Sequence, residues 1–216
     1  MGRYSSSVIE KRRYQSKVRG DAARRTRELI RDAGAALFVD KGYVSASAKD
    51  IADAAGVAPR TVFTAFPGGK LEIFEAAFSH ALEAESVDDS APVRRDHSGP
   101  DDVRRLVAQI VEQSIGLLER AGPLMMTAVQ SSGADADMRR LAAESSEQSF
   151  ANATSIAEGL AEHGLLRNDI SVDKASGVLA ALVSPHVHQQ LRSIGGWNVN
   201  DYREWLEFAI RTNLMY

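Results

Sequence analysis

Residues 47–66 constrain the fold of this chain more than any other stretch of its sequence. Ser47 precedes a helical pattern of apolar residues, and Asp50 follows three residues later, which is the spacing of a capping box. Gly56 stands where this first helix has to end, because glycine adopts the left-handed backbone conformation without a steric penalty. Pro59 suits the first turn of a second helix, where its missing N–H would have no partner. The stretch therefore predicts two short helices joined by a tight turn.

The second of these helices is expected to have one apolar and one polar face. Val62 and Phe66 lie one turn apart, whereas Arg60, Thr61 and Thr64 occupy the opposite side. A small helix pair with a polar outer face on its second member is the helix-turn-helix arrangement that reads the major groove of DNA. Arginine can donate to phosphates or to guanine, and threonine can donate to phosphate or contact a thymine methyl group.

Charge is distributed unevenly along the chain. Residues 1–27 contain nine Lys/Arg and two acidic residues, a local charge of +7, although the net charge of the whole chain is −3. Residues 87–216 contain twelve Lys/Arg and eighteen acidic residues, a local charge of −6. A basic front and an acidic rear favour polyanion binding by the front alone, and a solvated charged tail is the alternative. We expect residues 1–20 to form a flexible arm whose basic residues are Arg3, Lys11, Arg12, Arg13, Lys17 and Arg19.

The remainder of the chain has helical periodicity and no strand-like alternation of useful length. Beyond the opening pair, the expected helices span about 21–41, 70–86, 101–120, 124–131, 135–163, 172–194 and 200–216. Gly122-Pro123 is expected to break the chain between two of them, and Pro185 to kink another. The polar segment 87–100 is the candidate domain boundary, because it contains two prolines and a glycine. The sequence therefore predicts an all-α protein.

Several classes of function find no support in the sequence. The absence of cysteine excludes disulfides and thiolate metal sites and fits a reducing cytoplasm. No apolar run approaches the roughly 18 residues of a membrane span, and the N-terminus has no signal-peptide core. His186 and His188 are two residues apart, which points them away from each other on a helix. We interpret the five histidines as surface residues and predict no metal, no cofactor, no catalytic residues and a cytoplasmic location.

A set of residues between positions 24 and 78 carries a family resemblance. It comprises Ala36-Leu37-Phe38, Gly42-Tyr43, Ile51-Ala52, Ala55-Gly56-Val57, Thr61-Val62-Phe63, Phe66 and Lys70. In the order and nearly the spacing of these residues, the chain resembles the tetracycline-repressor (TetR) family of bacterial regulators. Near the C-terminus, Gly195-Gly196-Trp197 followed by Tyr202, Trp205 and Leu206 is similar to the family's last-helix pattern.

The resemblance implies an all-helical homodimer with two functional parts. An N-terminal three-helix helix-turn-helix domain would bind DNA, and a C-terminal helical bundle would bind a ligand and dimerise through its last two long helices. We accordingly expect a basic arm at 1–20, a DNA-binding domain at 21–69, a connecting helix at 70–86 and an effector-binding and dimerisation domain at 87–216.

Positions that match the family's DNA-binding residues follow from the same resemblance. They are Ser47, Lys49, Pro59, Arg60, Thr61, Phe63, Thr64, Ala65 and Lys70. Phe63 stands where the family usually has tyrosine, so a hydroxyl contact to phosphate is lost. Ala58 replaces the usual serine, so the second helix lacks a side-chain cap worth about 1 kcal/mol. The turn 67–69 is one residue longer than is common, which affects the aim of Lys70.

Two further sets of residues are predicted in the C-terminal part. The ligand-pocket candidates are Leu117, Met125, Met126, Val129, Gln130, Phe150, His163, Leu182 and His186. The dimer-interface candidates are Val178, Ala181, Pro185, Leu191, Trp205, Phe208 and Ala209. Methionines suit adaptable pockets and ordinary cores alike. Four polar residues of the helix 135–163 line a partly polar cavity or face water, and these are Ser146, Ser149, Asn152 and Thr154.

Together, these features predict that the protein is a DNA-binding transcriptional regulator. We expect a repressor dimer that a small organic effector of unknown identity releases from a near-palindromic double-stranded DNA operator. Two recognition helices would then lie about 34 Å apart or slightly more. The alternatives are an effector-independent architectural DNA-binding protein with a filled C-terminal core, and a helical enzyme or adaptor in which the helix-turn-helix only packs.

Overall fold

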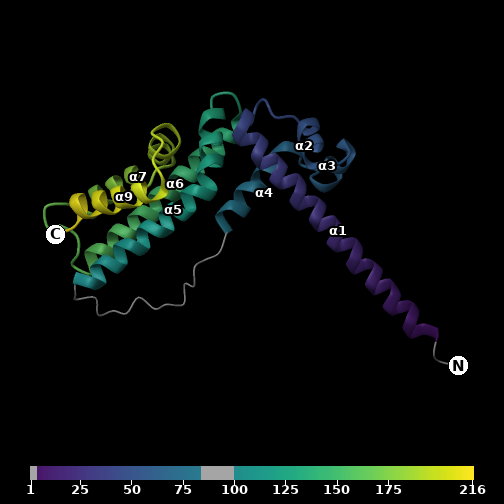
Figure 1. The fold of residues 1–216 in the computed structure, drawn as a ribbon, viewed down its shortest axis with the longest axis horizontal. Coiled ribbons are helices and arrows are strands. Elements are labelled where there is room, and N and C mark those ends of the chain that lie inside the picture. Colours follow the sequence, from purple (N-terminus) through teal and green to yellow (C-terminus); the bar gives the residue numbers. More distant parts are fainter. Residues whose placement is uncertain (1–3, 84–99) are drawn as a thin grey trace. The chain divides into compact units, whose positions relative to one another are not determined.

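The computed structural model describes residues 4–83 and 100–216, and the side chains of residues 20–83 and 103–216. The chain divides into two compact units, residues 1–79 and residues 80–216. In the described ranges the regular structure is helical, apart from one isolated antiparallel bridge between Leu166 and Met215 (Figure 1). The predicted all-α class is therefore confirmed. Residues 87–99 of the expected boundary segment, and Arg3 of the expected arm, lie outside the described residues.

The first unit is built around the two short helices predicted from residues 47–66. Its helices are α1 (Tyr4–Lys41), α2 (Ala48–Ala55), α3 (Pro59–Ala65) and α4 (Gly69–Glu83), whose last turn belongs to the second unit. An aromatic cluster of Phe38, Tyr43 and Phe74 holds the centre, with ring centroids 5.4–5.6 Å apart. Gly34 permits close packing of α1 on α4, because a Cβ there would lie 2.5 Å from the Cγ2 of Ile73. The helices α2 and α3 thus pack on an apolar core formed by residues of α1, α4 and the turn at Tyr43.

Helix α1 begins much earlier than the sequence predicted. We expected a flexible arm over residues 1–20 and a helix from about residue 21, whereas α1 runs from Tyr4. Residues 4–19 contain no proline or glycine, and five of these sixteen residues are Arg or Lys, which favour helices. Gly20 costs only about 1 kcal/mol within a helix. The helix therefore continues through the position where we placed its start.

The second unit is a bundle of longer helices. Its elements are α5 (Pro100–Ser131), α6 (Ala136–Glu162), α7 (Val172–Leu182), α8 (Pro185–Gln189), the π-helical turn η1 (Gln190–Ile194) and α9 (Val199–Leu214). Helices α5 and α6 lie side by side (Figure 1). Apolar residues of α5, α6, α7 and α9 form one continuous core, which includes Val107, Val111, Ala157, Leu160, Leu179, Leu206 and Ile210. This core fixes the helices around the cavities described below.

The predicted break at Gly122-Pro123 is wrong, because α5 continues through it. Pro123 removes one N–H from the helix, which would otherwise bond to the carbonyl four residues earlier. Burial on both sides outweighs that loss: Ala121 and Leu124 are at most 4 % exposed. Thr127 donates its hydroxyl to the carbonyl of Pro123 at 3.0 Å. Tertiary packing has overridden the local signal.

The expected helix 172–194 is in fact two helices. It ends at Leu182 and restarts at Pro185, so this proline begins α8 instead of kinking a continuous helix. Ser184 caps the restart, since its hydroxyl accepts a hydrogen bond from the N–H of Val187 at 3.2 Å. Proline suits the first position of a helix, because its φ angle is already helical. The resulting corner at Val183–Ser184 forms part of a cavity wall.

Candidate functional site

The helix-turn-helix has the caps that the sequence predicted. The N–H of Asp50 donates to the Ser47 hydroxyl at 3.1 Å, and the N–H of Ser47 donates to the Asp50 carboxylate at 3.0 Å. The Ser47 hydroxyl also donates to the Asp50 carboxylate at 2.6 Å, and this bond, with the one from the Ser47 N–H, lowers the pKa of Asp50. Gly56 ends α2 with φ of 66°. Ala58 makes no side-chain cap on α3, as expected from its methyl group.

The inner face of α3 is held by a residue that the sequence did not single out. Val62 and Phe66 are fully buried. The guanidinium of Arg27 lies 3.9 Å from the centre of the Phe66 ring and donates to the carbonyl of Ala65. It also donates to the Glu72 carboxylate at 2.7 Å. Arg27 therefore joins α1, the end of α3 and α4.

Glu72 extends this clamp to the turn before α4. Its second carboxylate oxygen accepts the N–H of Gly68 at 2.8 Å. The hydrogen bond from Arg27 and then that from Gly68 lower the pKa of Glu72. No local pattern in the sequence marks the pair, because Arg27 and Glu72 are 45 residues apart. This long-range ion pair thus adds to the buried contacts of Val62 and Phe66 that hold α3 in place.

Replacing Glu72 by glutamine is expected to lower the stability of the first unit at neutral pH. A lowered carboxyl pKa contributes stability that is present above the ordinary value near 4.5 and is lost as the pH falls through the folded-state value. The side chain is one-third exposed, so we expect a loss of about 1 kcal/mol or less. Thermal unfolding of both proteins between pH 3 and pH 7 measures the effect.

The matched control is Glu28→Gln, which removes a carboxylate whose nearest partner, Arg24, is 3.8 Å away. It should change the melting temperature far less than Glu72→Gln does at pH 7. The Glu72→Gln effect should shrink as the pH falls through the lowered pKa of Glu72. A Glu72→Gln effect that stays constant across this range would show that the ion pair is not its cause.

The outer face of α3 carries the predicted DNA-reading residues. Pro59, Arg60, Phe63 and Thr64 are exposed, whereas Thr61 and Ala65 are half-buried. The Phe63 ring is 55 % exposed, which is unusual for so large an apolar side chain. The hydroxyl of Thr64 donates to the carbonyl of Arg60 at 2.9 Å, so in this conformation it offers only acceptor lone pairs. Arg60 is therefore the strongest donor on this face.

The other predicted DNA-binding residues flank α3. Lys49 is exposed on α2, and the hydroxyl of Ser47 is engaged in its cap. Lys70 differs from expectation, because its ammonium donates to the carbonyls of Tyr43 at 2.8 Å and Val44 at 3.4 Å. It also lies 4.3 Å from the centre of the Tyr43 ring. Lys70 ties α4 to the turn before α2, which leaves at most one ammonium proton for a phosphate.

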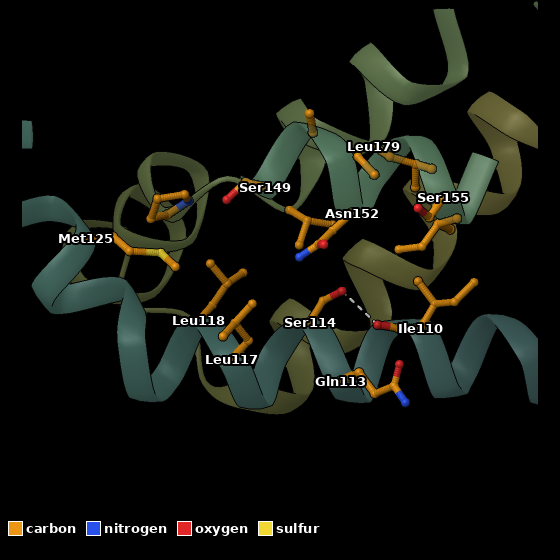
Figure 2. A pocket seen from close by; sticks show the side chains of 15 residues that line it. Ile110, Gln113, Ser114, Leu117, Leu118, Met125, Ser149, Asn152, Ser155 and Leu179 are labelled. Carbon is orange, nitrogen blue, oxygen red and sulfur yellow. Dashed lines mark hydrogen bonds between the residues drawn. The ribbon is translucent and has the colours of Figure 1, made fainter. Parts of the chain in front are cut away.

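The second unit contains a cavity of about 300 Å³ between α5, α6 and α7. Figure 2 shows Leu117, Leu118 and Ser114 of α5 facing Ser149 and Asn152 of α6 across it. The further lining residues are Ile110, Gln113, Met125, Ala153, Ser155, Ile156, Leu179, Ala180, Val183 and Pro185. A volume of about 300 Å³ is at the lower end of the range of small-molecule sites, roughly 300–1,000 Å³.

A smaller cavity of about 160 Å³ adjoins the first. The two share Met125, Ser149, Ala180 and Pro185. The smaller one is completed by Val129, Ala142, Ser145, Ser146, Phe150, Ser184 and His186. The corner between α7 and α8 thus forms a wall common to both cavities.

The cavities bring together Leu117, Met125, Val129, Phe150 and His186 from the predicted pocket. Four predicted members line neither cavity. Met126 is buried on another side of α5, and Gln130 is exposed. His163 is exposed, with its Nδ1 2.7 Å from the carbonyl of Gly159, and Leu182 packs on the hydrophobic core. The sequence did not decide whether Ser149 and Asn152 line a cavity or face solvent, and both line the larger cavity.

His188 is buried, contrary to the interpretation of the histidines as surface residues. It is 8 % exposed, and its Nε2 lies 3.1 Å from the Glu119 carboxylate, which also accepts from Arg192 at 2.8 Å. The hydrogen bond from Arg192 is the main reason that the pKa of Glu119 is lowered. The ring of Tyr202 packs edge-on against His188 at 5.1 Å. This cluster joins α5, α8, η1 and α9.

The hydroxyl of Tyr202 is buried with no hydrogen-bond partner within the described structure. Burial, with the nearby charge of Glu119, raises the pKa of Tyr202 to about 12. Replacing it by phenylalanine removes an unsatisfied polar group, so we expect the protein to gain about 1 kcal/mol or more of stability. Denaturant unfolding at pH 7 measures this change, and a clear loss of stability would reveal a partner for the hydroxyl.

Only part of the predicted dimer face is exposed on this chain. Ala209 is 6 % exposed and packs in the interior of its own unit, so it offers little surface to a partner in this conformation. Val178, Leu191 and Trp205 pack partly on the core, and Pro185 lines the cavities. Ala181 is exposed, and the Phe208 side chain is 68 % exposed. An open groove beside Phe208 is lined by Glu204, Glu207, Arg211, Thr212 and Tyr216.

The described residues show neither a metal-binding cluster nor a membrane-spanning helix. No group of three or more His, Cys, Asp or Glu side chains in them is arranged to hold a metal ion. None of the helices in residues 4–83 and 100–216 is both long and apolar enough to cross a lipid bilayer.

Comparison with known proteins places the helix-turn-helix in a family. The family described as "Bacterial regulatory proteins, tetR family" matches residues 30–77, which contain α2, α3 and most of α4. No curated protein matches the sequence.

Solved structures share the fold of the whole chain. A putative transcriptional regulator from Saccharomonospora viridis, in complex with choline, has 23% identity and a TM-score of 0.65, with 88% of this chain and 97% of that chain covered. NalD, the secondary repressor of the MexAB-OprM multidrug efflux pump in Pseudomonas aeruginosa, has 22% identity and a TM-score of 0.63, with 90% and 98% covered. SmeT in complex with triclosan has 18% identity and a TM-score of 0.61, with 88% and 92% covered.

The capped helix pair, the exposed polar face of α3 and the two-unit helical fold agree with these matches. The helix-turn-helix domain therefore belongs to the tetR family of bacterial regulatory proteins, which makes the protein a DNA-binding transcriptional regulator.

Proposed function

We propose that the protein is a repressor whose dimer binds a near-palindromic operator and is released by a small organic effector. Two observations carry the proposal. Arg60 is exposed on the outer face of α3, whose inner face is buried, and the other unit contains a cavity of about 300 Å³. The first feature supplies a rigid reading surface, and the second supplies room for a ligand.

Release is a shift between two states of the dimer. The effector has to bind one state more tightly than the other, since a ligand with equal affinity for both shifts nothing. A tenfold change in operator affinity requires about 1.4 kcal/mol of such coupling, which is within the usual range for allosteric proteins. The corner at Val183–Ser184 is a suitable element for this coupling, because it begins α8 and lines the cavities.

The similar proteins support both halves of the proposal. NalD is a repressor, and the Saccharomonospora viridis and SmeT structures hold choline and triclosan. The architectural alternative required a filled C-terminal core, and the two cavities count against it. The enzyme or adaptor alternative required a helix-turn-helix without a reading surface, and the exposed face of α3 counts against that.

The test uses DNA recovered by the protein from a random duplex pool. Operator affinity is measured with the wild-type protein and with Ala180→Phe, which places a bulky side chain in the wall shared by both cavities. Its control is Ala143→Phe at an exposed position of α6. A compound that weakens operator binding by the wild type and the control, but not by Ala180→Phe, supports the proposal. A compound that affects all three equally acts elsewhere.

Deletion of residues 1–19 is expected to reduce the salt dependence of operator binding. The segment contains six Lys/Arg, and each phosphate contact contributes about 0.9 to the slope of log affinity against log salt concentration. If the basic residues contact phosphates, the slope should fall by 1 or more. Fluorescence anisotropy of labelled operator across a salt series measures it, and an unchanged slope would show that the segment makes no such contacts.

A further inference from the structure

We infer that the effector is an uncharged, largely apolar molecule that accepts a hydrogen bond from the side-chain amide of Asn152. This inference rests on the proposed effector function and names the class of ligand. Among the described residues that line the two cavities, none is Asp, Glu, Lys or Arg. An ion buried in the larger cavity would find no countercharge, and burying an unpaired ion costs several kcal/mol. The larger cavity therefore selects against charged ligands, whereas the smaller one contains the imidazole of His186.

The polar groups of the larger cavity are mostly satisfied by their own helices. The hydroxyl of Ser114 donates to the carbonyl of Ile110 at 2.7 Å, a bond drawn in Figure 2. The hydroxyl of Ser149 donates to the carbonyl of Ser145 at 2.8 Å, and that of Ser155 donates to the carbonyl of Ala151 at 3.2 Å. With their hydrogens used, these hydroxyls present only acceptor lone pairs to a ligand.

Asn152 provides the complementary donor. Its amide oxygen accepts a hydrogen bond from the Gln148 amide at 3.0 Å, which orients the amide nitrogen. Figure 2 shows this nitrogen directed into the cavity from α6, towards Ser114 on α5. The rest of the surface around it is formed by Leu117, Leu118 and Leu179 and the other apolar residues named above. The other side-chain amide of the lining, that of Gln113, is directed away from the cavity in Figure 2. A donor directed into a largely apolar site fixes the orientation of a ligand that carries a carbonyl, ether or hydroxyl oxygen.

Two further properties limit the ligand. The cavity of about 300 Å³ corresponds to about ten water molecules at liquid density, and the adjoining 160 Å³ allows an elongated ligand to extend towards Phe150 and His186. No aromatic residue lines the larger cavity, so it lacks the ring faces that hold quaternary ammonium ions. The choline held by the similar Saccharomonospora viridis protein is therefore a poor fit for this site.

The test is calorimetric titration of the full-length protein with three probes that share one alkyl chain. Octanamide is neutral, octanoate is an anion and octyltrimethylammonium is a cation. We expect octanamide to bind at least tenfold more tightly than either ion. An ion that binds as tightly as octanamide, or the absence of octanamide binding at millimolar concentration, would overturn the inference.

Two pairs of variants locate the site. Asn152→Leu removes the donor at nearly constant side-chain volume, and we expect it to lower the affinity for octanamide at least fivefold. The affinity for octane-1-thiol, a poor hydrogen-bond acceptor, should change by less than twofold. Thr154→Val on the same helix lines neither cavity and should leave both affinities unchanged. Ala180→Phe should abolish octanamide binding, and Ala143→Phe should not. Equal octanamide affinity for the wild type and Asn152→Leu would contradict the role of Asn152.

Operator affinity in the same samples separates this inference from the proposed function. Binding of octanamide with unchanged operator affinity would leave the ligand class standing and count against the effector mechanism. Preferential binding of an ion, with release of the operator, would leave the mechanism standing and overturn the ligand class.

Discussion

Replacing Arg60 by alanine is expected to weaken binding of the protein to its selected DNA by about 5-fold to 150-fold, which corresponds to about 1–3 kcal/mol. Arg60 lies exposed on α3, where its guanidinium is the strongest donor of the face. Thr64 has already donated its hydroxyl hydrogen to the carbonyl of Arg60, and Phe63 offers only an apolar contact. Fluorescence anisotropy with labelled duplex at fixed salt concentration measures the loss.

The charge-matched control is Arg104→Ala on α5, outside the helix-turn-helix. It changes the net charge by the same amount and should alter affinity by less than twofold. If Arg60 reads a base, the variant should also lose discrimination at one position in each half-site. Equal effects of the two variants would mean that α3 does not face the DNA.

Replacing Phe208 by aspartate is expected to dissociate the proposed dimer and lower operator affinity by more than 100-fold. The Phe208 side chain is 68 % exposed on α9, beside a groove that contains Glu204, Glu207 and Tyr216. In a two-fold symmetric interface each substitution acts twice. An unpaired charge buried there costs several kcal/mol. Sedimentation velocity of the purified variant measures its oligomeric state.

Val39→Asp is the matched control for this substitution. Val39 is also an exposed apolar residue, 49 % accessible, but it lies on α1 in the first unit. The control should sediment as the wild type does. A dimeric Phe208→Asp protein, or a wild-type protein that is monomeric at micromolar concentration, would place the interface elsewhere or exclude it.

Local signals in the sequence predicted the helix-turn-helix well. The cap at Ser47, the left-handed Gly56 and the uncapped start of α3 each depend on a few neighbouring residues, so their structure follows from their order. Local signals failed where packing or helix propensity outweighed them. Pro123 lies inside a helix because its neighbours are buried, and Gly20 does not interrupt α1 because the residues before it favour a helix.

Long-range contacts were the part that the sequence did not reveal. The pairing of Arg27 with Glu72 spans 45 positions, and the bond from Lys70 to Tyr43 spans 27. The cavity was predicted only in part for the same reason. Periodicity shows which residues of a helix share a face, but whether that face meets another helix, a cavity or solvent depends on the packing of distant segments. Asn152, which was left open between cavity and solvent, lines the larger cavity. Met126, which was predicted to line the pocket, is buried away from both cavities.

Selection of DNA from a random duplex pool by the full-length protein tests the central claim most directly. The account predicts enrichment of an inverted repeat whose half-site centres are about 34 Å apart or slightly more, close to one turn of DNA. Binding of the enriched sequence should depend on Arg60. Recovery of a pool without a repeated motif, or of one that the Arg60→Ala variant binds equally well, would contradict it.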